Sequence, residues 1–296
     1  MPLAPALAAA IAQAIRAATG EVFAFASLQP VGGGCINQNL AATGQDGRRF
    51  FIKLNDADKA EMFAAEAAGL EALGATGAIR VPRALAHGTG PGQAWLVLEW
   101  LPLGGHGDAA RLGRQLAALH LTQGEVFGWW RDNTIGATPQ VNTPNRDWIA
   151  FYREERLGRQ LRMAARNGAR RALLDAGERL MAELPAFFPG HAPPPSLLHG
   201  DLWGGNHGFA DGEPVLFDPA VYHGDREADL AMTELFGGFP ETFYAAYREA
   251  WPLDAGYRTR RTLYNLYHVL NHFNLFGGGY GAQAGRMLGQ LLAEIR

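Results

Sequence analysis

The order of apolar and polar positions divides the chain into a first third of short strands and a helical remainder. Residues 22–31, 39–42 and 48–54 are rich in strand-forming residues and are separated by glycine-containing turns. This pattern predicts an antiparallel meander. A nearly continuous apolar run at 93–101 is typical of a buried strand. Residues 1–18 precede the strands, and their Ala, Ile and Leu content predicts an amphipathic helix rather than a signal peptide.

A helix is predicted from about 58 to 73, and its apolar face contains one carboxylate. Met62, Glu66 and Leu70 fall on one face at intervals of four residues. A buried carboxylate needs a positive partner, and Lys53 on the preceding strand is the nearest candidate. The alternative is that Glu66 lies at the edge of the stripe and reaches water. We expect the Lys53–Glu66 ion pair.

The rest of the chain has helical periodicity, which makes the protein an α+β protein with two lobes. We expect a small N-lobe, residues 1–101, with an antiparallel sheet plus a helix, and a larger, mostly helical C-lobe, residues 102–296. The predicted C-lobe helices span 108–121, 145–165, 170–188, 225–235, 240–250 and 257–276. The last one carries His268 and His272, a spacing that can bind metal. No third ligand is evident, so packing and polar contacts to a substrate are favoured.

Composition excludes several classes of protein. The 296 residues are 48% hydrophobic and 19% charged, with a formal net charge of −3. No broad basic field is present to bind nucleic acid or an anionic membrane. No apolar run approaches the ~20 residues needed to span a bilayer. Cys35 is the only cysteine, so no intrachain disulfide can form and a cytoplasmic location is expected.

Two apolar runs each end in an acidic residue, and the stretch between them carries an amide. Asp201 ends the first run, Asn206 follows five positions later, and Asp218 ends the second run. In the protein-kinase catalytic loop an Asp and an Asn have the same spacing, and a metal-binding Asp follows the next strand. Asp201 would take a proton from a substrate hydroxyl, while Asn206 and Asp218 would bind Mg²⁺. The alternative is a loop in which these side chains only cap turns.

The N-lobe contains residues that suit a nucleotide. Gly32, Gly33 and Gly34 let the backbone approach a phosphate, although a glycine run is also an ordinary hairpin turn. The chain has only two lysines, and one of them, Lys53, stands on the third strand of the meander. Kinases keep a phosphate-binding lysine at that place. The hinge after the buried strand would be Glu99–Leu101, with Glu99, Trp100 and Leu101 offering backbone groups to adenine.

A loop at 127–136 combines aromatic and polar side chains, among them Asn133. Such loops bind small polyols by ring stacking and hydrogen bonds, and they also occur as packed corners. Both interpretations stay open, with Asn133 and His268 as candidate substrate contacts.

Together these residues resemble the fructosamine/ketosamine-3-kinase family, within the aminoglycoside-phosphotransferase and protein-kinase-like fold. The resemblance covers essentially the whole chain. It is carried by segments 32–37, 51–53, 199–206, 218–220 and 226–239, and by Glu66 with its helix. The Leu-Trp-Gly-Gly-Asn sequence at 202–206 is more specific for this family than the preceding His-Gly-Asp. The resemblance implies phosphorylation of the 3-hydroxyl of ketosamines, the sugar adducts of amines, in protein deglycation. It also implies redox control through Cys35 by an intermolecular disulfide.

The mechanism that follows uses ATP and Mg²⁺. ATP would bind between the lobes, with its phosphates at the glycine run and Lys53, and Asp201 would deprotonate the sugar hydroxyl. Trp203, next to the base, is a candidate platform for the sugar. The partner is a small or protein-bound ketosamine, and the protein is a monomer or a homodimer, with a Cys35-linked dimer as one option. The alternatives are a choline, aminoglycoside or homoserine kinase, or a pseudokinase that only binds nucleotide.

Overall fold

The computed structural model of the protein describes residues 3–32, 36–104 and 106–295. The chain forms two compact units, and each is described here by itself. The first comprises Met1–Asp108 and Gly205–Pro219, and the second comprises Ala109–Gly204 and Ala220–Arg296. The predicted division after residue 101 differs from these units in two ways: the first unit continues to residue 108, and it takes in a later segment.

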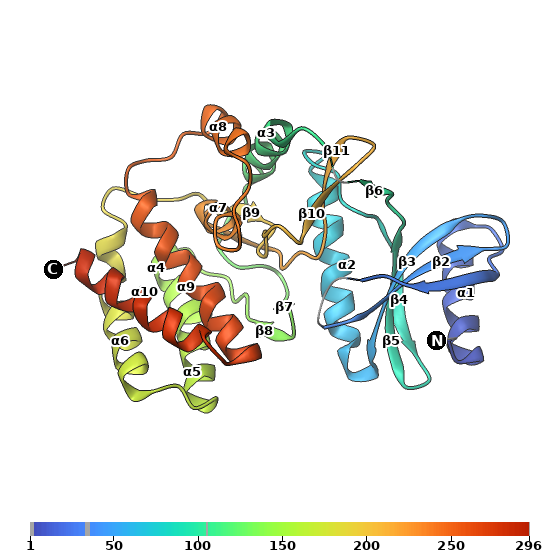
Figure 1. Cartoon of the computed structure of the whole chain (residues 1–296), viewed down its shortest axis with the longest axis horizontal. Helices are drawn as coiled ribbons and strands as arrows, with labels where there is room; N and C mark the ends of the chain where they lie inside the picture. Colours follow the sequence, from blue (N-terminus) through green and yellow to red (C-terminus); the bar gives the residue numbers. More distant parts are fainter. Residues whose placement is uncertain (1–2, 33–35, 105, 296) are drawn as a thin grey trace. The chain divides into compact units, whose positions relative to one another are not determined.

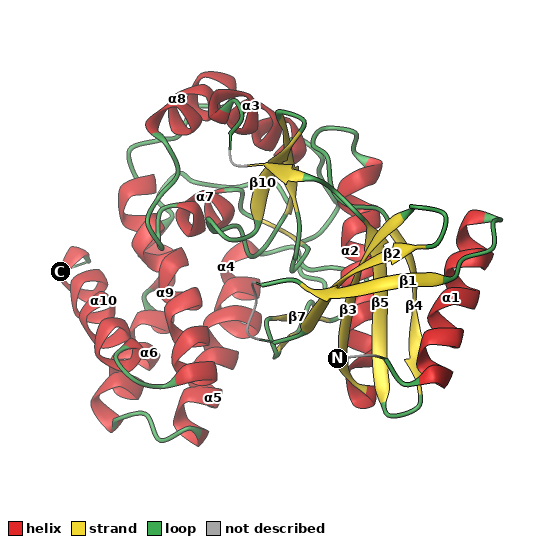
Figure 2. Ribbon diagram, turned by 45° about the vertical axis from the view of Figure 1, so that its right-hand side comes forward, coloured by secondary structure: helices red, strands yellow, loops and turns green. Residues whose placement is uncertain are grey.

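The first unit is built on a five-stranded antiparallel sheet with the order β1-β2-β3-β5-β4. Its strands are β1 (Phe25–Pro30), β2 (Gln38–Gly44), β3 (Arg49–Asp56), β4 (Ala84–Gly90) and β5 (Gln93–Glu99). Two helices, α1 (Pro5–Thr19) and α2 (Ala60–Ala75), flank the sheet, the latter after a short 3₁₀ turn at Ala57–Lys59. Figure 2 shows α1 and α2 on opposite sides of the strands. The predicted meander is therefore present as β1-β2-β3.

Alternation along the strands explains this arrangement, because successive side chains point to opposite faces of a sheet. One face packs against α1, whose Leu7, Ile11 and Ile15 are fully buried on Ile52 and Val97. The other face packs against α2. The buried residues of this second core are Met62, Phe63, Leu70, Ala94, Leu96 and Leu98. The two neighbouring strands β3 and β5 thus each contribute side chains to both cores, which fixes their pairing register.

A short segment from later in the chain returns to the first unit. It forms a hairpin of β10 (His207–Ala210) and β11 (Glu213–Leu216), and β10 also pairs with β6 (Leu103–Gly104). Figure 1 labels β6, β10 and β11 together, although their colours show that they come from distant parts of the sequence. Because the two strands are antiparallel, the residues just before β10 and just after β11 lie close together.

The second unit is mainly helical. Its helices are α3 (Ala109–His120), α4 (Trp148–Phe151), a π-helix (Tyr152–Gly158), α5 (Arg159–Arg166), α6 (Arg171–Ala182), a 3₁₀ turn (Leu184–Phe187), α7 (Glu227–Thr233), α8 (Glu241–Ala250), α9 (Tyr257–Phe276) and α10 (Tyr280–Glu294). Two strand pairs complete it, β7 (Asn133–Ile135) with β8 (Thr138–Gln140) and β9 (Ser196–Leu198) with β12 (Tyr222–Gly224). None of the helices in the described part of the chain is both long and apolar enough to cross a membrane.

Candidate active site

Lys53 is held between two carboxylates of the first unit. Its side chain points toward α2, because its neighbours Ile52 and Leu54 point to the α1 face. The Lys53 ammonium donates to Glu66 Oε1 at 2.6 Å and to Asp218 Oδ1 at 2.6 Å. The Lys53 side chain is 3% exposed and that of Glu66 is 10% exposed. The predicted ion pair between Lys53 and Glu66 is confirmed, and Asp218 joins it.

The charges in this cluster stabilise one another. Burial by itself lowers the pKa of Lys53, but the nearby carboxylates of Asp218 and Glu66 outweigh it and raise that pKa above its ordinary value. Burial raises the pKa of Glu66, and the ammonium of Lys53 opposes this shift. Lys53 is therefore a permanently charged group, and it depends on its acidic partners.

The β10–β11 hairpin carries the two predicted metal ligands. Asn206 immediately precedes β10, and Asp218 lies two residues beyond β11; the backbone N–H of Phe217 donates to the carbonyl of Asn206 at 3.1 Å. The Asn206 amide nitrogen lies 3.5 Å from the backbone oxygen of Asp218. Asp218 has a left-handed backbone (φ 57°), which is unusual for a residue other than glycine. A carboxylate and an amide, the hard oxygen donors that suit Mg²⁺, thus share one end of a hairpin.

Asp201 lies in a tight loop after β9 in the second unit. The backbone carbonyl of His199 accepts from Ala220 N at 2.8 Å, which continues the β9–β12 pairing. Gly200 has φ 83°, and a Cβ there would lie 2.0 Å from the carbonyl oxygen of Ala220. Only glycine fits that turn. The backbone N–H of Asp201 then donates to His199 Nδ1 at 3.3 Å.

The backbone of this loop is hydrogen-bonded to a buried carboxylate. Asp229 on α7 accepts from the backbone N–H groups of His199 at 2.7 Å and Gly200 at 2.8 Å. His120 Nε2 lies 3.1 Å from the same carboxylate, and the hydroxyl of Tyr247 lies 2.8 Å from His120 Nδ1. Burial by itself raises the pKa of Asp229, but hydrogen bonds from His120 and Gly200 outweigh it and hold that pKa below its usual range.

The predicted hinge is held by side chains of the first unit. Glu99 Oε1 accepts from Arg80 at 3.1 Å. The guanidinium of Arg49 lies 3.8 Å from the ring centroid of Trp100, a cation–π contact. Leu101 follows and is half-buried. These contacts fix the side chains of the segment, and its role toward adenine stays a prediction.

Of the predicted glycine run, only Gly32 belongs to the described residues. It follows β1, and the space beside it is open, since a Cβ there would meet nothing within 4 Å. Gly33, Gly34 and Cys35 lie outside the described residues. The predicted phosphate and redox roles of these three residues stay predictions.

The candidate substrate contacts lie in three different settings. Trp203 is 40% exposed and meets the ring of Phe236 edge-on at a centroid distance of 6.3 Å. His268 is buried, and burial lowers its pKa to about 3, so it is neutral. Asn133 is also buried, and its amide donates to the carbonyl of Val221 at 2.7 Å. Two further side-chain amides donate to Asn133 Oδ1. Of the three candidates, Trp203 is the one most available to a ligand.

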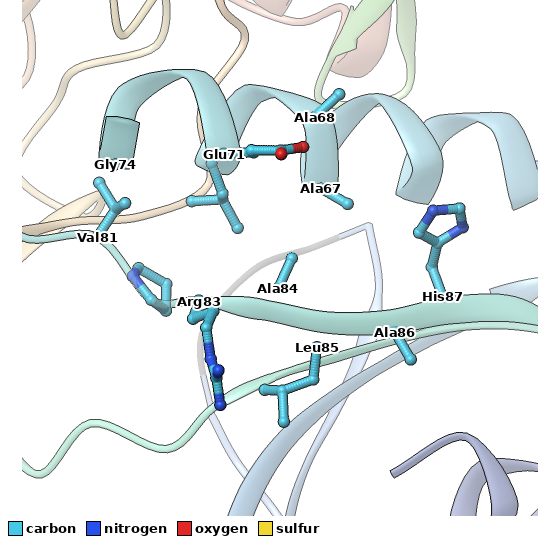
Figure 3. Close-up of a pocket in the computed structure, with 12 residues that line it drawn as sticks. Ala67, Ala68, Glu71, Gly74, Val81, Arg83, Ala84, Leu85, Ala86 and His87 are labelled. Carbon is cyan, nitrogen blue, oxygen red and sulfur yellow. The ribbon is translucent and has the colours of Figure 1, made fainter. Parts of the chain in front are cut away.

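A separate cavity of about 790 Å³ lies in the first unit between α2 and β4. Figure 3 shows Ala67 and Ala84 pointing into the space between the helix and the strand. Polar side chains among its lining residues are Glu71, Arg83 and His87. None of the predicted site residues that the structure describes lines it. Its apolar walls and mixed charges suit no particular ligand class.

One cluster in the second unit has metal-ligating residue types. Ligand atoms of His191, Glu227 and Asp254 lie within 4.8 Å of one another. Arg260 already supplies a positive charge there, with hydrogen bonds of 2.7–2.9 Å to both carboxylates. We therefore interpret this cluster as an ion-pair network.

Two features of the candidate site are not predicted from the sequence pattern. His120, the last residue of α3, is fully buried and lies within hydrogen-bond distance of Tyr247 and Asp229. Its position four residues after Leu116 on the apolar stripe is the signal that could have indicated burial. The contact of Asp218 with Lys53 has no local signal, because the two residues are 165 positions apart.

The chain matches a known family and its members over nearly its whole length. The family described as fructosamine kinase matches residues 7–294. A probable ketoamine kinase of Synechocystis sp. is 49% identical over 286 residues, covering 95% of this chain and 96% of that protein. A chloroplastic protein-ribulosamine 3-kinase of Arabidopsis thaliana is 43% identical over 283 residues, covering 94% of this chain and 86% of that one.

Solved structures agree with the predicted fold. The crystal structure of a proposed fructosamine-3-kinase from Haemophilus somnus superimposes with a TM-score of 0.88 at 30% identity, covering 95% of this chain and 96% of that chain. A macrolide 2′-phosphotransferase from Brachybacterium faecium superimposes with a TM-score of 0.59 at 20% identity, covering 94% and 97%, which shows the fold alone. The predicted α+β, kinase-like fold is confirmed. With its family match, its relatives and its fold in agreement, the chain belongs to the fructosamine kinase family, a family of phosphotransferases.

Proposed function

We propose that this protein transfers a phosphoryl group from ATP to the sugar 3-hydroxyl of a ketosamine, in the repair of glycated amines. The observation that carries the proposal is the buried Lys53 ammonium held by Glu66 and Asp218. A permanently charged lysine on the third strand suits the phosphates of a nucleotide. The names of the relatives, ketoamine kinase and protein-ribulosamine 3-kinase, support the substrate.

In this proposal the nucleotide is held by the first unit. Glu66 orients Lys53 toward the phosphates, and Gly32–Gly34 supply backbone N–H groups to them. The backbone of Glu99–Leu101 pairs with adenine. Asn206 and Asp218 would hold Mg²⁺, because both offer the oxygen donors that this ion prefers. When bound, Mg²⁺ neutralises charge on the phosphates during transfer.

Asp201 acts on the substrate hydroxyl. It accepts the proton of that hydroxyl as the oxygen attacks, and its loop is kept in one conformation by Asp229. Trp203 lies two positions further and offers an aromatic face to the sugar. Because phosphoryl transfer needs little covalent work from the protein, the fixed geometry of this loop supplies most of its contribution.

The test is a phosphorylation screen with Asp201→Asn as the matched variant. Purified protein is incubated with ATP, Mg²⁺ and a ribulosamine or fructosamine, beside choline, an aminoglycoside and homoserine. We expect turnover of a ketosamine, and a fall in kcat of about 10²–10⁴-fold in Asp201→Asn with nucleotide binding retained. Thermal unfolding of both proteins checks that the substitution leaves the fold intact.

Two results would contradict the proposal. Turnover of another alcohol without any ketosamine activity would assign the same chemistry to a different substrate. Nucleotide binding without turnover of any alcohol, and no change on Asp201→Asn, would indicate a binding module.

A further inference from the structure

Five aromatic side chains of the second unit form a continuous surface that starts next to Asp201; we call it the aromatic wall. Its members are Trp203, Phe236, His272, Phe276 and Tyr280. The ring centroids of successive members lie 6.3 Å apart for Trp203–Phe236 and 4.8 Å apart for Phe236–His272. His272 also meets Phe276 at 5.7 Å and Tyr280 at 5.1 Å. Rings from four separate segments therefore share one surface.

The aromatic wall is partly open to solvent and has free space at two of its edges. Trp203 is 40% exposed and Phe276 is 53% exposed. Phe236 is followed by two glycines with positive φ, and Phe276 is followed by two more. A Cβ at any of these four glycines would meet nothing within 4 Å. The positions that directly follow these two rings are therefore open.

The aromatic wall is uncharged, and its central ring, His272, offers a hydrogen-bond acceptor. His272 Nδ1 lies 2.8 Å from the backbone carbonyl of His268, so Nδ1 carries the proton and donates. Burial lowers the pKa of His272, which keeps the ring neutral. The lone pair of a neutral, Nδ1-protonated ring is on Nε2. Within the described part of the chain, Nδ1 is the His272 nitrogen that takes part in a hydrogen bond.

We propose that the aromatic wall binds the alkylammonium portion of the ketosamine, which is the protonated amine nitrogen and the carbon chain attached to it. The proposal rests on the proposed function and adds the recognition of the amine to it. Aromatic faces attract an alkylammonium cation, and their apolar area suits its carbon chain. The backbone N–H of Trp203 donates to the carbonyl of Asp201 at 3.2 Å, so the first ring is tied to the catalytic loop. The protein would therefore select sugars that carry a basic alkylamine.

The test compares two substrates that differ in charge and little in shape. They are the ribulose adducts of ethylamine, whose nitrogen is protonated at neutral pH, and of 2,2,2-trifluoroethylamine, whose nitrogen is neutral. We expect a KM about 5-fold lower for the ethylamine adduct in the natural protein. Phe236→Leu, which keeps apolar bulk but removes the ring, and His272→Phe, which removes the acceptor, should each lose most of this preference with kcat little changed.

Leu121→Ala is the control, because Leu121 is 62% exposed in the same unit and lies outside both the aromatic wall and the 127–136 loop. It should leave both KM values unchanged. If Phe236→Leu does not fold, Tyr280→Leu takes its place. The proposal is overturned if the natural protein shows no preference, or if the variants raise both KM values equally. It is also overturned if the variants abolish a dimer in sedimentation experiments without changing KM. Failure to phosphorylate either adduct would instead reject the proposed function.

Discussion

The Lys53 ammonium lies between two carboxylates that differ in their exposure. The Glu66 side chain is 10% exposed and that of Asp218 is 42% exposed. Charge attraction is weakened by water, and water reaches the ion pair with Glu66 less than the ion pair with Asp218. The charge of Asp218 nevertheless raises the pKa of Lys53 at least as much as that of Glu66 does, so both carboxylates hold Lys53 in place.

Removal of the Glu66 charge should weaken nucleotide binding more than it weakens the fold. In Glu66→Gln the amide keeps the volume but loses the charge-assisted hydrogen bond, which is worth about 1.5–3 kcal/mol. We expect the KM for ATP to rise at least about tenfold. Steady-state kinetics with ATP as the varied substrate measure this. Glu71→Gln, an exposed change on the same helix, should have no effect; equal effects of both variants would argue against an orienting role for Glu66.

This residue cluster shows where prediction from the sequence succeeds and where it stops. The pairing of Lys53 with Glu66 follows from two local periodicities, the alternation of a strand and the stripe of a helix. The prediction that Asn206 and Asp218 bind a metal ion follows from their spacing and stays a prediction. The contact of Asp218 with Lys53 depends on the return of a distant hairpin to the first unit, which no local pattern encodes.

Among the elements, α7 positions the catalytic loop through one side chain. Both oxygens of Asp229 are occupied by backbone N–H groups of the loop, and His120 adds a third hydrogen bond. In Asp229→Asn one of these oxygens is replaced by an amide –NH₂ group, which then faces a donor. We expect a loss of about 2–3 kcal/mol in the free energy of unfolding and a lower kcat, with the KM for ATP nearly unchanged. Urea denaturation and steady-state kinetics measure the two effects.

The control for this prediction is Asp175→Asn on α6, where the carboxylate is exposed and pairs with Arg171 one turn away. That change should cost less than about 0.5 kcal/mol. If Asp229→Asn raised the KM for ATP without lowering kcat, α7 would not be acting through the catalytic loop.

A second contact between elements involves a titratable side chain, that of His191. His191 precedes β9, and its two ring nitrogens lie 2.7 Å from Asp225 Oδ2 and 3.0 Å from Asp254 Oδ2. Burial by itself lowers the pKa of His191, but the hydrogen bond and the charge of Asp225 outweigh it and raise that pKa above its ordinary value. Glu227 raises it further, whereas the guanidinium of Arg260 opposes the shift. The His191 ring therefore connects its own segment to the segments that carry Asp225 and Asp254.

The contribution of the His191 hydrogen bonds to the free energy of unfolding should decline as the pH rises. Because the folded-state pKa of His191 is raised, its contribution is fully present below the unfolded value of about 6.5 and is lost as the pH passes the folded value. We expect His191→Gln to lower the free energy of unfolding by about 1 kcal/mol more at pH 6 than at pH 8.5. Urea denaturation at both pH values measures this. His87→Gln, an exposed change, is the control variant. A larger effect of His191→Gln at pH 8.5 would reverse the assignment.

The helix predicted at 145–165 shows a limit of pattern analysis at the scale of elements. The structure forms α4, a π-helix and α5 in succession over this range. A π-helix changes the phase of the faces along a helix. As a result Arg156 is fully buried and donates to the Val141 carbonyl and to Asn142 Oδ1. The helical character could be predicted, but the exposed face could not.

At the scale of the whole molecule, the first unit is not one continuous piece of chain. It consists of Met1–Asp108 and the later segment Gly205–Pro219. That segment pairs with β6, its Val215 bridges to Arg80, and the ring of Phe209 fills the space beside Gly107. A boundary placed by composition finds the end of the N-terminal strands, but it cannot find a segment that returns from elsewhere. This explains why the predicted division after residue 101 leaves part of the unit out.

A fragment of residues 1–108 should therefore be less stable than the same fragment joined to residues 205–219 by a flexible linker of about 15 residues. The short fragment leaves the buried Lys53 with one carboxylate, and it exposes the surface on which the β10–β11 hairpin packs. We expect the joined fragment to gain at least about 2 kcal/mol in the free energy of unfolding, measured by urea denaturation. Asp218→Asn in the joined fragment should remove part of this gain, because it takes away the ion pair but keeps the strand pairing. Equal stability of the two fragments would mean that the later segment contributes residues to the site without stabilising the unit that holds it.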